Sequence, residues 1–319
     1  MGRGCRRKNG AKSKRRADEE RPRGMRALAE IVELPQGRVA SYEVIGEGKP
    51  MLYFQGGPGY SASLLRDDAE LLADRFAVHL IDPPGSGRST PPDDSSQYDH
   101  LGHARFYEEV RQGLGVERAT IMGISFGSLV ALTYAALFPD RATRCIAVAS
   151  RVTGEEGAGD EGARETEQML ARHEGEPWYP SARETWWAWT ERVLAAREAS
   201  EVDEMMAEIL PLYTADPERP GVKRMIDAWR GELATNLEAV KVWENGLYQT
   251  IDIRPLLNDV RCPVLALAGE LDLICGPFHA NALARALPDA RVMIIPDCGH
   301  FIPAEAPDAF REAILAFAG

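Results

Sequence analysis

Short runs of apolar residues alternate along most of the chain with longer amphipathic stretches. Seven runs are rich in β-branched and other apolar residues and are bounded by turn residues, a pattern typical of strands. They are RVASYEVIG (38–46), MLYF (51–54), FAVHLID (76–82), ATIMGI (119–124), RCIAVAS (144–150), VLALAG (264–269) and VMIIP (292–296). Helical patterns separate most of them, so the sequence predicts an α/β fold, with a mostly parallel central sheet and helices on both faces. No helical pattern separates the first two runs, which we expect to begin the sheet as a hairpin.

The alternation stops between residues 151 and 250, where helical patterns follow one another without a strand. This segment contains all six tryptophans: Trp178, Trp186, Trp187, Trp189, Trp229 and Trp243. We therefore divide the chain into a basic arm (1–26), an α/β core (27–150 and 251–319) and an inserted helical cap (151–250). The glycine-rich run 154–163 is interpreted as a flexible hinge into the cap. Most of the tryptophans are expected to pack the cap, because aromatic side chains mainly serve as buried mass.

The formal charge of −12 is unevenly distributed. Residues 1–26 contain eleven basic and three acidic residues, a net charge of +8, so the other 26 basic and 46 acidic residues carry −20. The arm has almost no large apolar residues and is interpreted as a disordered, solvated extension, with binding to nucleic acid or an acidic surface as the alternative. The acidic main body argues against a nucleic-acid partner. No apolar run approaches the roughly 20 residues that a membrane span needs.

The five cysteines (Cys5, Cys145, Cys262, Cys275 and Cys298) are scattered and form no CxxC pair. This usage is typical of a reduced, cytoplasmic protein, and the arginine pairs of the arm lack the apolar stretch of an export signal. His100 and His103 share a helix face, but no third ligand is evident nearby, so no metal site is predicted. A thiol nucleophile at Cys298 is an alternative to the serine described next.

The strongest chemical motif is G-x-S-x-G, formed by residues 123–127 (GISFG). It lies between the strand pattern ATIMGI and the helical pattern LVALTYAALF. A sharp strand-to-helix turn strains the central residue and brings backbone close on both sides, which explains the two glycines. The turn also places Ser125 at a helix N-terminus, where free N–H groups favour an oxyanion. Ser125 is therefore the candidate nucleophile.

A serine is a weak nucleophile unless a base, itself held by a third group, removes its proton. Asp272 follows the strand pattern 264–269, and His300 follows the pattern 292–296. The carboxyl ends of parallel strands meet at one edge of a sheet, and the chain order serine, acid, histidine is the one expected for this architecture. Glu270 is the alternative acid, although it lies earlier in its turn. We expect Ser125, Asp272 and His300 to form a catalytic triad.

The run QGGPG (55–59) directly follows the strand pattern MLYF. In this architecture, one oxyanion donor is the N–H of the residue after the nucleophile, and the second comes from the loop after an early strand. These donors would be Phe126 and Gly57. Two glycines let the backbone pass close to a carbonyl oxygen, and Pro58 stiffens the turn.

Together these motifs resemble the α/β-hydrolase superfamily and, within it, the proline iminopeptidases. QGGPG corresponds to HGGPG of that family, IDPPGSGRSTP to DQRGxGRSTP, and GISFGS to GGSxGS, while GELDLICGP and GHFIPAEAP match late in the chain. The resemblance covers most of residues 38–150 and 262–319, and a helical cap after the sixth strand is also typical of the family. Gln55 stands where the family has histidine, and Pro83-Pro84 stand where it has Gln-Arg.

The resemblance implies roles for particular residues. Ser125 would be the nucleophile, His300 the general base and Asp272 its orienting acid, with the N–H groups of Gly57 and Phe126 as the oxyanion hole. In the family, cap glutamates hold the free amino terminus of the substrate. The stretch VWENGLY resembles the corresponding family segment, and its glutamate is Glu244.

The sequence therefore predicts a serine hydrolase that acts through an acyl-enzyme. Its substrate would be a short peptide with a free amino terminus, or a small ester, lactone or thioester. The alternatives are an acyl transferase or cyclase with the same triad, and a non-catalytic binding protein on the same fold. The candidate substrate-binding residues are Gln55, Trp187, Trp243 and Glu244. The chemistry implies no cofactor, no metal and no membrane, and the sequence does not specify an oligomeric state.

Overall fold

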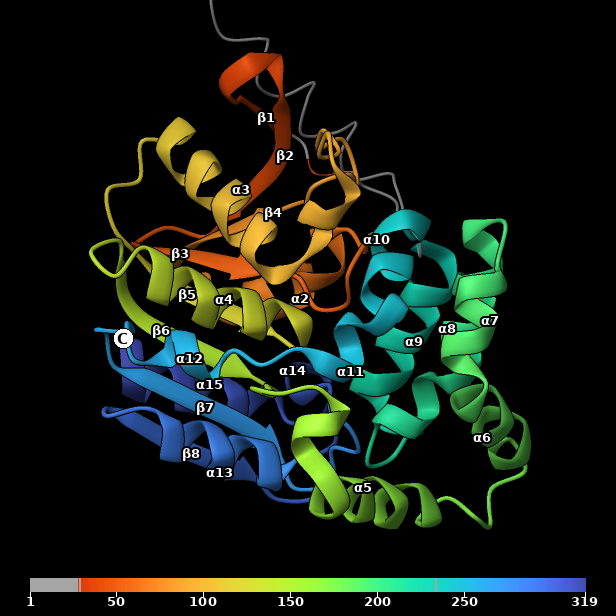
Figure 1. The fold of residues 1–319 in the computed structure, drawn as a ribbon. Helices are drawn as coiled ribbons and strands as arrows, with labels where there is room; N and C mark the ends of the chain where they lie inside the picture. Colours follow the sequence, from red (N-terminus) through yellow and green to blue (C-terminus); the bar gives the residue numbers. More distant parts are fainter. Residues whose placement is uncertain (1–27, 29, 233) are drawn as a thin grey trace, which may run out of the picture.

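An eight-stranded sheet forms the centre of the molecule (Figure 1). The computed structural model describes residue 28, residues 30–232 and residues 234–319, so the predicted basic arm lies outside the described residues. The strand order is β1-β2-β4-β3-β5-β6-β7-β8, and β3 to β8 run parallel. The strands are β1 (Glu30–Glu33), β2 (Val39–Ile45), β3 (Lys49–Phe54), β4 (Phe76–Ile81), β5 (Ala119–Ile124), β6 (Ala142–Val148), β7 (Val264–Gly269) and β8 (Ala290–Ile295). The predicted α/β class is confirmed.

The predicted hairpin between β2 and β3 is wrong, because β4 lies between these two strands. β4 pairs antiparallel with β2 and parallel with β3, and the hairpin of this sheet joins β1 to β2. The link from β2 to β3 donates its backbone hydrogen bonds to the segment that leads into β4, from Glu47 N to Ala73 O (3.2 Å) and from Lys49 N to Arg75 O (3.3 Å). These hydrogen bonds join the β2–β3 link to the segment before β4, so β2 and β3 are not connected by a hairpin turn.

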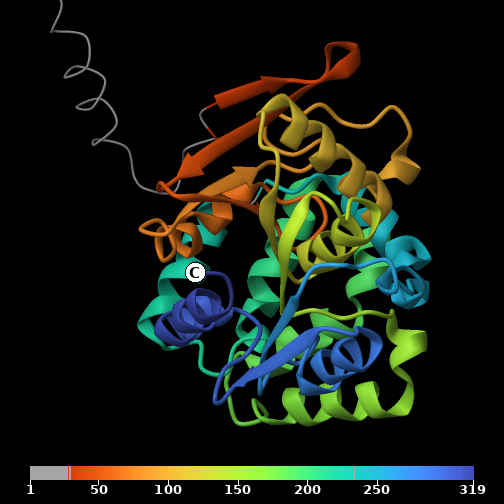
Figure 2. The ribbon, with the colours of Figure 1, turned by 90° about the vertical axis from the view of Figure 1, so that its left-hand side faces the viewer.

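Both faces of the sheet are covered by helices, which produces two hydrophobic cores. Along β3, Leu52 and Phe54 pack into one core while Met51 and Tyr53 pack into the other, as the two-residue period of a strand requires. One face carries α3 (His100–Gly113), α4 (Phe126–Leu137), α12 (Arg254–Leu257) and α13 (Pro277–Ala286), and the other carries α2 (Arg66–Glu70), α14 (Ile302–Glu305) and α15 (Pro307–Ala318). Figure 2 shows α13 and α15 on opposite sides of the sheet.

The chain between β6 and β7 is helical and lies beyond the carboxyl ends of the parallel strands (Figure 1). It contains α5 (Glu155–Ala171), α6 (Tyr179–Trp187), α7 (Trp189–Ala195), α8 (Ala199–Ile209), α9 (Pro220–Glu232), α10 (Leu237–Val242), α11 (Tyr248–Thr250), the 3₁₀ turn η4 (Leu210–Tyr213) and the π-turn η5 (Trp243–Leu247). Helices α5, α6, α8 and α9 share an apolar cluster that includes Leu170, Ile209 and Val222. We call this segment the cap. Its limits at residues 151 and 250 stay a prediction.

The run 154–163, predicted as a flexible hinge, is mostly helical, and its flexibility stays a prediction. Helix α5 begins at Glu155 and includes most of this run, with a break only at Gly159, whose φ is 60°. Gly159 has nothing within 4 Å of the position of a Cβ atom, so the break faces open space. Short 3₁₀ turns complete the fold at η1 (Pro35–Gly37), η2 (Ala62–Leu65) and η3 (Ser95–Tyr98). Among the described residues, no helix is both long and apolar enough to span a membrane.

Candidate active site

Ser125 lies in a strained turn between β5 and α4. Its φ of 53° and ψ of −124° place it in a region that non-glycine residues rarely occupy. A Cβ atom at Gly123 would lie 2.0 Å from the carbonyl oxygen of Gly127, and one at Gly127 would lie 2.3 Å from that of Phe54. Both contacts are with backbone that cannot move aside. The glycines of the motif are therefore required by the space around the turn, as the sequence predicted.

Replacing Gly123 with alanine is expected to destabilise the protein by at least about 3 kcal/mol, because the added methyl group collides with backbone in a packed core. Urea denaturation would measure this change. The matched control is Gly175→Ala, since Gly175 has an ordinary φ and nothing within 4 Å of its Cβ position. That variant should stay within about 0.5 kcal/mol of the parent. Equal stability of the two variants would contradict the steric reason given for Gly123.

Asp272 and His300 form a buried pair at the carboxyl ends of β7 and β8. The Nδ1 atom of His300 lies 2.8 Å from Oδ2 of Asp272. The other oxygen, Oδ1, accepts hydrogen bonds from the backbone N–H groups of Ile274 (2.8 Å) and Cys275 (3.0 Å). Burial alone would raise the pKa of Asp272, but the charge of a His300 imidazolium and these hydrogen bonds outweigh it and lower the pKa. The carboxylate is thus held ionised beside the ring.

Glu270, the alternative acid, lies elsewhere. It is exposed, and its Oε2 accepts a hydrogen bond from the backbone N–H of Asp297 (3.0 Å). Gly269, the last residue of β7, has no room for a side chain, because its Cβ would lie 2.1 Å from the carbonyl oxygen of Gly299. The loop that carries His300 therefore packs directly on the end of β7, and Asp272 is the acid brought against the ring.

The loop that carries His300 is fixed by the cap. The His300 N–H donates to the carbonyl oxygen of Tyr213 (2.8 Å). Oε2 of Glu305 accepts from the N–H groups of Gly299 (3.0 Å) and Ala215 (2.8 Å), and so joins the loop to the cap segment after η4. Because cap and core share these bonds, the position of the ring depends on correct docking of the cap.

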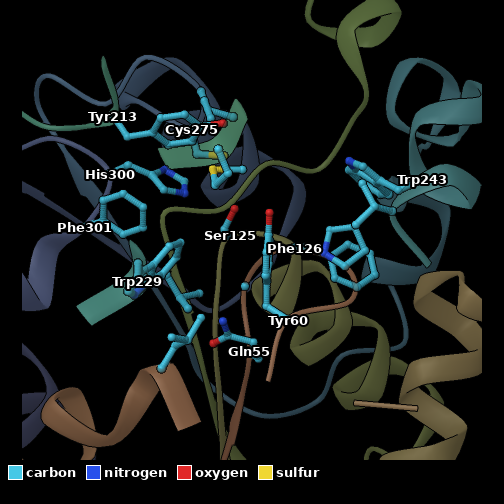
Figure 3. Close-up of a pocket in the computed structure, with 18 of the residues that line it drawn as sticks. Gln55, Tyr60, Ser125, Phe126, Tyr213, Trp229, Trp243, Cys275, His300 and Phe301 are labelled. Carbon is cyan, nitrogen blue, oxygen red and sulfur yellow. The ribbon is translucent and has the colours of Figure 1, made fainter. Parts of the chain in front are cut away.

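Ser125 and His300 line one pocket of about 290 Å³ between the sheet and the cap. Figure 3 shows the Ser125 hydroxyl pointing toward the side of the pocket where His300 and Cys275 lie. Asp272 lies behind His300, away from the pocket lining. The other predicted site residues also line this pocket: Gln55, Gly57, Phe126, Trp187, Trp243 and Glu244.

Two backbone N–H groups beside Ser125 are available to an incoming ligand. The N–H groups of Gly57 and Phe126 donate no hydrogen bond to any other residue in the described part of the chain. Phe126 begins α4, where the first N–H groups have no partner within the helix. Gly56 packs against the serine, since a Cβ atom on it would lie 3.2 Å from the Cβ of Ser125. The loop 55–59 therefore lies directly beside Ser125.

A buried carboxylate, that of Asp82, accepts hydrogen bonds from the residues that follow this loop. Asp82 follows β4 and is fully buried. Its Oδ1 accepts hydrogen bonds from Ser61 Oγ (2.6 Å) and Ala62 N (3.0 Å), and its Oδ2 accepts from Ser41 Oγ (2.6 Å). Asp82 belongs to the motif IDPPGSGRSTP, to which the sequence assigned no role. It holds the chain just after loop 55–59 against the end of β4.

A cap residue, Asn236, donates a hydrogen bond to the same loop. The backbone N–H of Asn236 donates to the carbonyl oxygen of Gly59 (2.9 Å). Its side-chain amide donates to the carbonyl oxygen of Gly85 (3.0 Å) and to the hydroxyl of Tyr98 (3.1 Å). Nothing in the sequence around Asn236 identifies this role, because it depends on where the cap docks.

The candidate binding residues of the cap differ in their surroundings. Glu244 is buried, and its carboxylate accepts hydrogen bonds from Trp189 Nε1 (2.9 Å) and Thr190 Oγ1 (2.7 Å). Trp243 packs edge-on against Phe126, with ring centroids 5.0 Å apart. Trp187 is 54% exposed and therefore lies at the outer part of the pocket.

Gln55 lines the pocket and is buried. Its Oε1 has no hydrogen-bond partner within the described residues. A buried amide oxygen without a partner costs free energy, which a hydrogen-bond donor on a bound molecule can recover. Gln55 thus keeps its place among the candidate binding residues.

Cys298 does not provide a nucleophile at this site. It is fully buried outside the pocket lining, and burial raises the pKa of its thiol. The four described cysteines are free thiols. Within the described residues, no group of three or more His, Cys, Asp or Glu side chains is arranged to hold a metal ion.

Known proteins match this fold over nearly its whole length. A family model described as alpha/beta hydrolase fold matches residues 49–199. A putative carbamate hydrolase, RutD, of Azorhizobium caulinodans is 26% identical over 294 residues, covering 87% of this chain and 94% of that protein. A probable proline iminopeptidase of Leptolyngbya boryana is 25% identical over 289 residues, covering 81% of this chain and 84% of that protein. A thermophilic esterase structure from Thermogutta terrifontis has a TM-score of 0.68 at 23% identity, covering 91% and 98% of the two chains.

The chain has the α/β-hydrolase fold. The predicted resemblance to proline iminopeptidases and the predicted enzyme class are confirmed. Several residues that line the pocket of this hydrolase were not predicted: Tyr60, Asp68, Arg151, Tyr213 and Phe301. Two had a usable signal, since Arg151 lies just beyond the carboxyl end of β6 and Phe301 follows His300. Asp68 had none, because its place in the pocket depends on how α2 packs on the sheet.

Proposed function

We propose that this protein is a serine hydrolase in which Ser125 is the nucleophile, His300 the general base and Asp272 the group that orients it. The observation that carries the proposal is the 2.8 Å contact between His300 Nδ1 and Asp272 Oδ2, with Ser125 at the strained turn of the same pocket. When Nδ1 donates to the carboxylate, Nε2 is the ring nitrogen left to act as the base toward Ser125.

The reaction begins when Oγ of Ser125 attacks a substrate carbonyl and Nε2 of His300 takes its proton. The N–H groups of Gly57 and Phe126 stabilise the oxyanion that forms, and each is worth about 3 kcal/mol on the scale of measured donor deletions. The imidazolium of His300 then protonates the leaving group, which leaves an acyl-enzyme. Water, activated by His300, attacks the acyl carbon and releases the acid.

The pocket favours esters of small, largely apolar acids. Its walls are mostly aromatic and apolar side chains, including Trp186, Trp229 and Trp243. Such walls stabilise apolar groups by burial and supply few partners for a peptide backbone. The names of the similar proteins point to esters, carbamates and amino-terminal peptide bonds as the range of substrates.

Release of an amino-terminal residue is a second candidate, and Glu244 favours it. This buried carboxylate lines the pocket on the side of Trp243 and accepts hydrogen bonds from the neutral donors of Trp189 and Thr190. A carboxylate in such a place can pair with the ammonium of a peptide substrate, and a buried pair of this kind depends strongly on the negative charge.

The two candidates predict different hydrolysis rates for p-nitrophenyl butyrate and proline p-nitroanilide. We expect the ester to be cleaved at least about 100-fold faster, since an ester has the better leaving group and needs no ammonium site. In that case, the rate of ester hydrolysis by Glu244→Gln should stay within about threefold of the wild-type rate. Faster cleavage of the anilide, lost in Glu244→Gln, would instead establish the aminopeptidase. If wild-type protein cleaves neither substrate, the hydrolase proposal loses its support.

A further inference from the structure

The pocket has two sides, which meet at Ser125 (Figure 3). Tyr213, Trp229 and Phe301 lie on the same side as His300, whereas Phe126 and Trp243 lie on the other. The first group is continuous, because the ring of Phe301 lies 5.3 Å from that of His300 and 5.2 Å from that of Trp229. We call it the histidine side.

The leaving group of a substrate must occupy the histidine side. His300 gives its proton to the departing atom, so that atom must lie within hydrogen-bond reach of the ring. The acyl group stays on Ser125 and extends the other way, toward Phe126 and Trp243. The residues of the histidine side therefore select the alcohol or amine that leaves.

Asp68 belongs to the histidine side. It lies in α2, one helical turn after Leu64, so the two side chains share a face. Leu64 packs into the apolar cluster that contains Trp229 and Phe301, and both Leu64 and Asp68 line the pocket. Oδ2 of Asp68 accepts a hydrogen bond from the hydroxyl of Tyr53 (2.9 Å). Oδ1 accepts none from any described residue.

The other charged side chains of the pocket lie on the opposite side. Arg151 lies over the ring of Tyr248, 5.0 Å from its centroid, and Tyr248 packs against Trp243. Glu244 accepts a hydrogen bond from Nε1 of Trp189. Among the described residues that line the pocket, Asp68 is thus the carboxylate that we assign to the side of the leaving group.

The surroundings of Asp68 suit a bound cation. Burial, only partly offset by the Tyr53 hydrogen bond, raises the pKa of its carboxyl to about 7. A carboxylate with so little stabilisation gains from an opposite charge nearby. Trp229 and Phe301 line the same pocket, and aromatic rings attract alkylammonium groups that lie close to them.

We propose that the leaving group of the natural substrate carries an ammonium group, held by the carboxylate of Asp68 and the rings of Trp229 and Phe301. The substrate class is then esters of amino alcohols, including quaternary ones. This inference rests on the proposed function. Hydrolysis consumes one water and yields an acid and the amino alcohol, whose oxygen receives its proton from His300.

Two esters of equal shape test this proposal: butyrylcholine and 3,3-dimethylbutyl butyrate, which differ by one positive charge. We expect wild-type kcat/KM, followed by pH-stat titration, to favour the choline ester by about 10-fold or more. Asp68→Asn should reduce that preference about 10-fold. The matched control is Asp67→Asn, which removes the same charge from the exposed neighbouring residue and should keep the preference.

The outcomes separate this proposal from the proposed function. If the neutral ester is hydrolysed and Asp68→Asn leaves the preference unchanged, the ammonium proposal is overturned and the hydrolase stands. If wild-type protein hydrolyses neither ester, the proposed function itself is at fault. Should Asp68→Asn fail to fold, competitive inhibition of the wild type decides instead: choline must bind at least about fivefold more tightly than 3,3-dimethylbutanol, and equal affinity would overturn the proposal.

Discussion

Replacing Ser125 with alanine is expected to lower kcat for p-nitrophenyl butyrate by about 10⁵-fold, close to the loss seen when a hydrolase triad loses its nucleophile. The reason is that no acyl-enzyme can form, while the oxyanion donors Gly57 and Phe126 remain and keep a residual rate above that in water. Initial rates with high enzyme concentration would measure the effect, and the binding of a competitive inhibitor should be unchanged.

The matched control for this variant is Ser86→Ala. Ser86 is buried, does not line the pocket, and its hydroxyl has no hydrogen-bond partner among the described residues. Its removal should leave kcat within about twofold. If the Ser125 variant kept its rate to within about tenfold of the wild type, another group would have to be the nucleophile.

Replacing Asp272 with asparagine is expected to lower kcat by about 10⁴-fold with little change in KM, since an amide of the same shape can turn its donor toward His300 and favour the wrong tautomer. Glu270→Gln is the matched control, because it removes the same charge two residues earlier from an exposed side chain. The kcat of Glu270→Gln should stay within about twofold of the wild-type value. Loss of activity in the Glu270 variant and not in the Asp272 variant would reverse the assignment.

The same substitution has a defined effect on stability against pH. The pKa of Asp272 is lowered from its ordinary value of 3.8 in the folded protein. A lowered pKa means that the ionised carboxylate contributes stability that is present above pH 3.8 and is lost as the pH falls below it. The difference in unfolding free energy between wild type and Asp272→Asn should therefore be constant near neutral pH and shrink in acid, as urea denaturation at several pH values would show.

The features that could be predicted from the sequence depend on local geometry. The motif at Ser125 predicts both glycines. Gly123 has no room for a side chain because of Gly127, four residues later, and Gly127 has none because of Phe54, at the end of the distant strand β3. Asp272 and His300 could be placed because each follows a strand, and parallel strands bring their carboxyl ends together. The seven predicted strand runs correspond to β2 to β8, because each run has the short, apolar, turn-bounded pattern of a strand.

The features that could not be predicted depend on distant packing. β1 has only four residues and three of them are exposed, so its pattern does not resemble a strand. No residue pattern within these strands specifies that β4 pairs between β2 and β3 in the sheet. Asn236 and Asp68 acquire their roles only when the cap and α2 dock beside the core. Local sequence patterns therefore describe the cap side of the pocket less well than the turn at Ser125.

The most direct test of the account is the reaction of the wild-type protein with a fluorophosphonate probe, followed by peptide mapping in a mass spectrometer. The triad predicts one adduct per chain, on Ser125, with no labelling of Ser125→Ala and at least about 100-fold slower labelling of His300→Ala, since the probe reacts only with an activated serine. Absence of labelling in folded wild-type protein, or an adduct on a different residue, would contradict the assignment of Ser125, His300 and Asp272 as the catalytic triad.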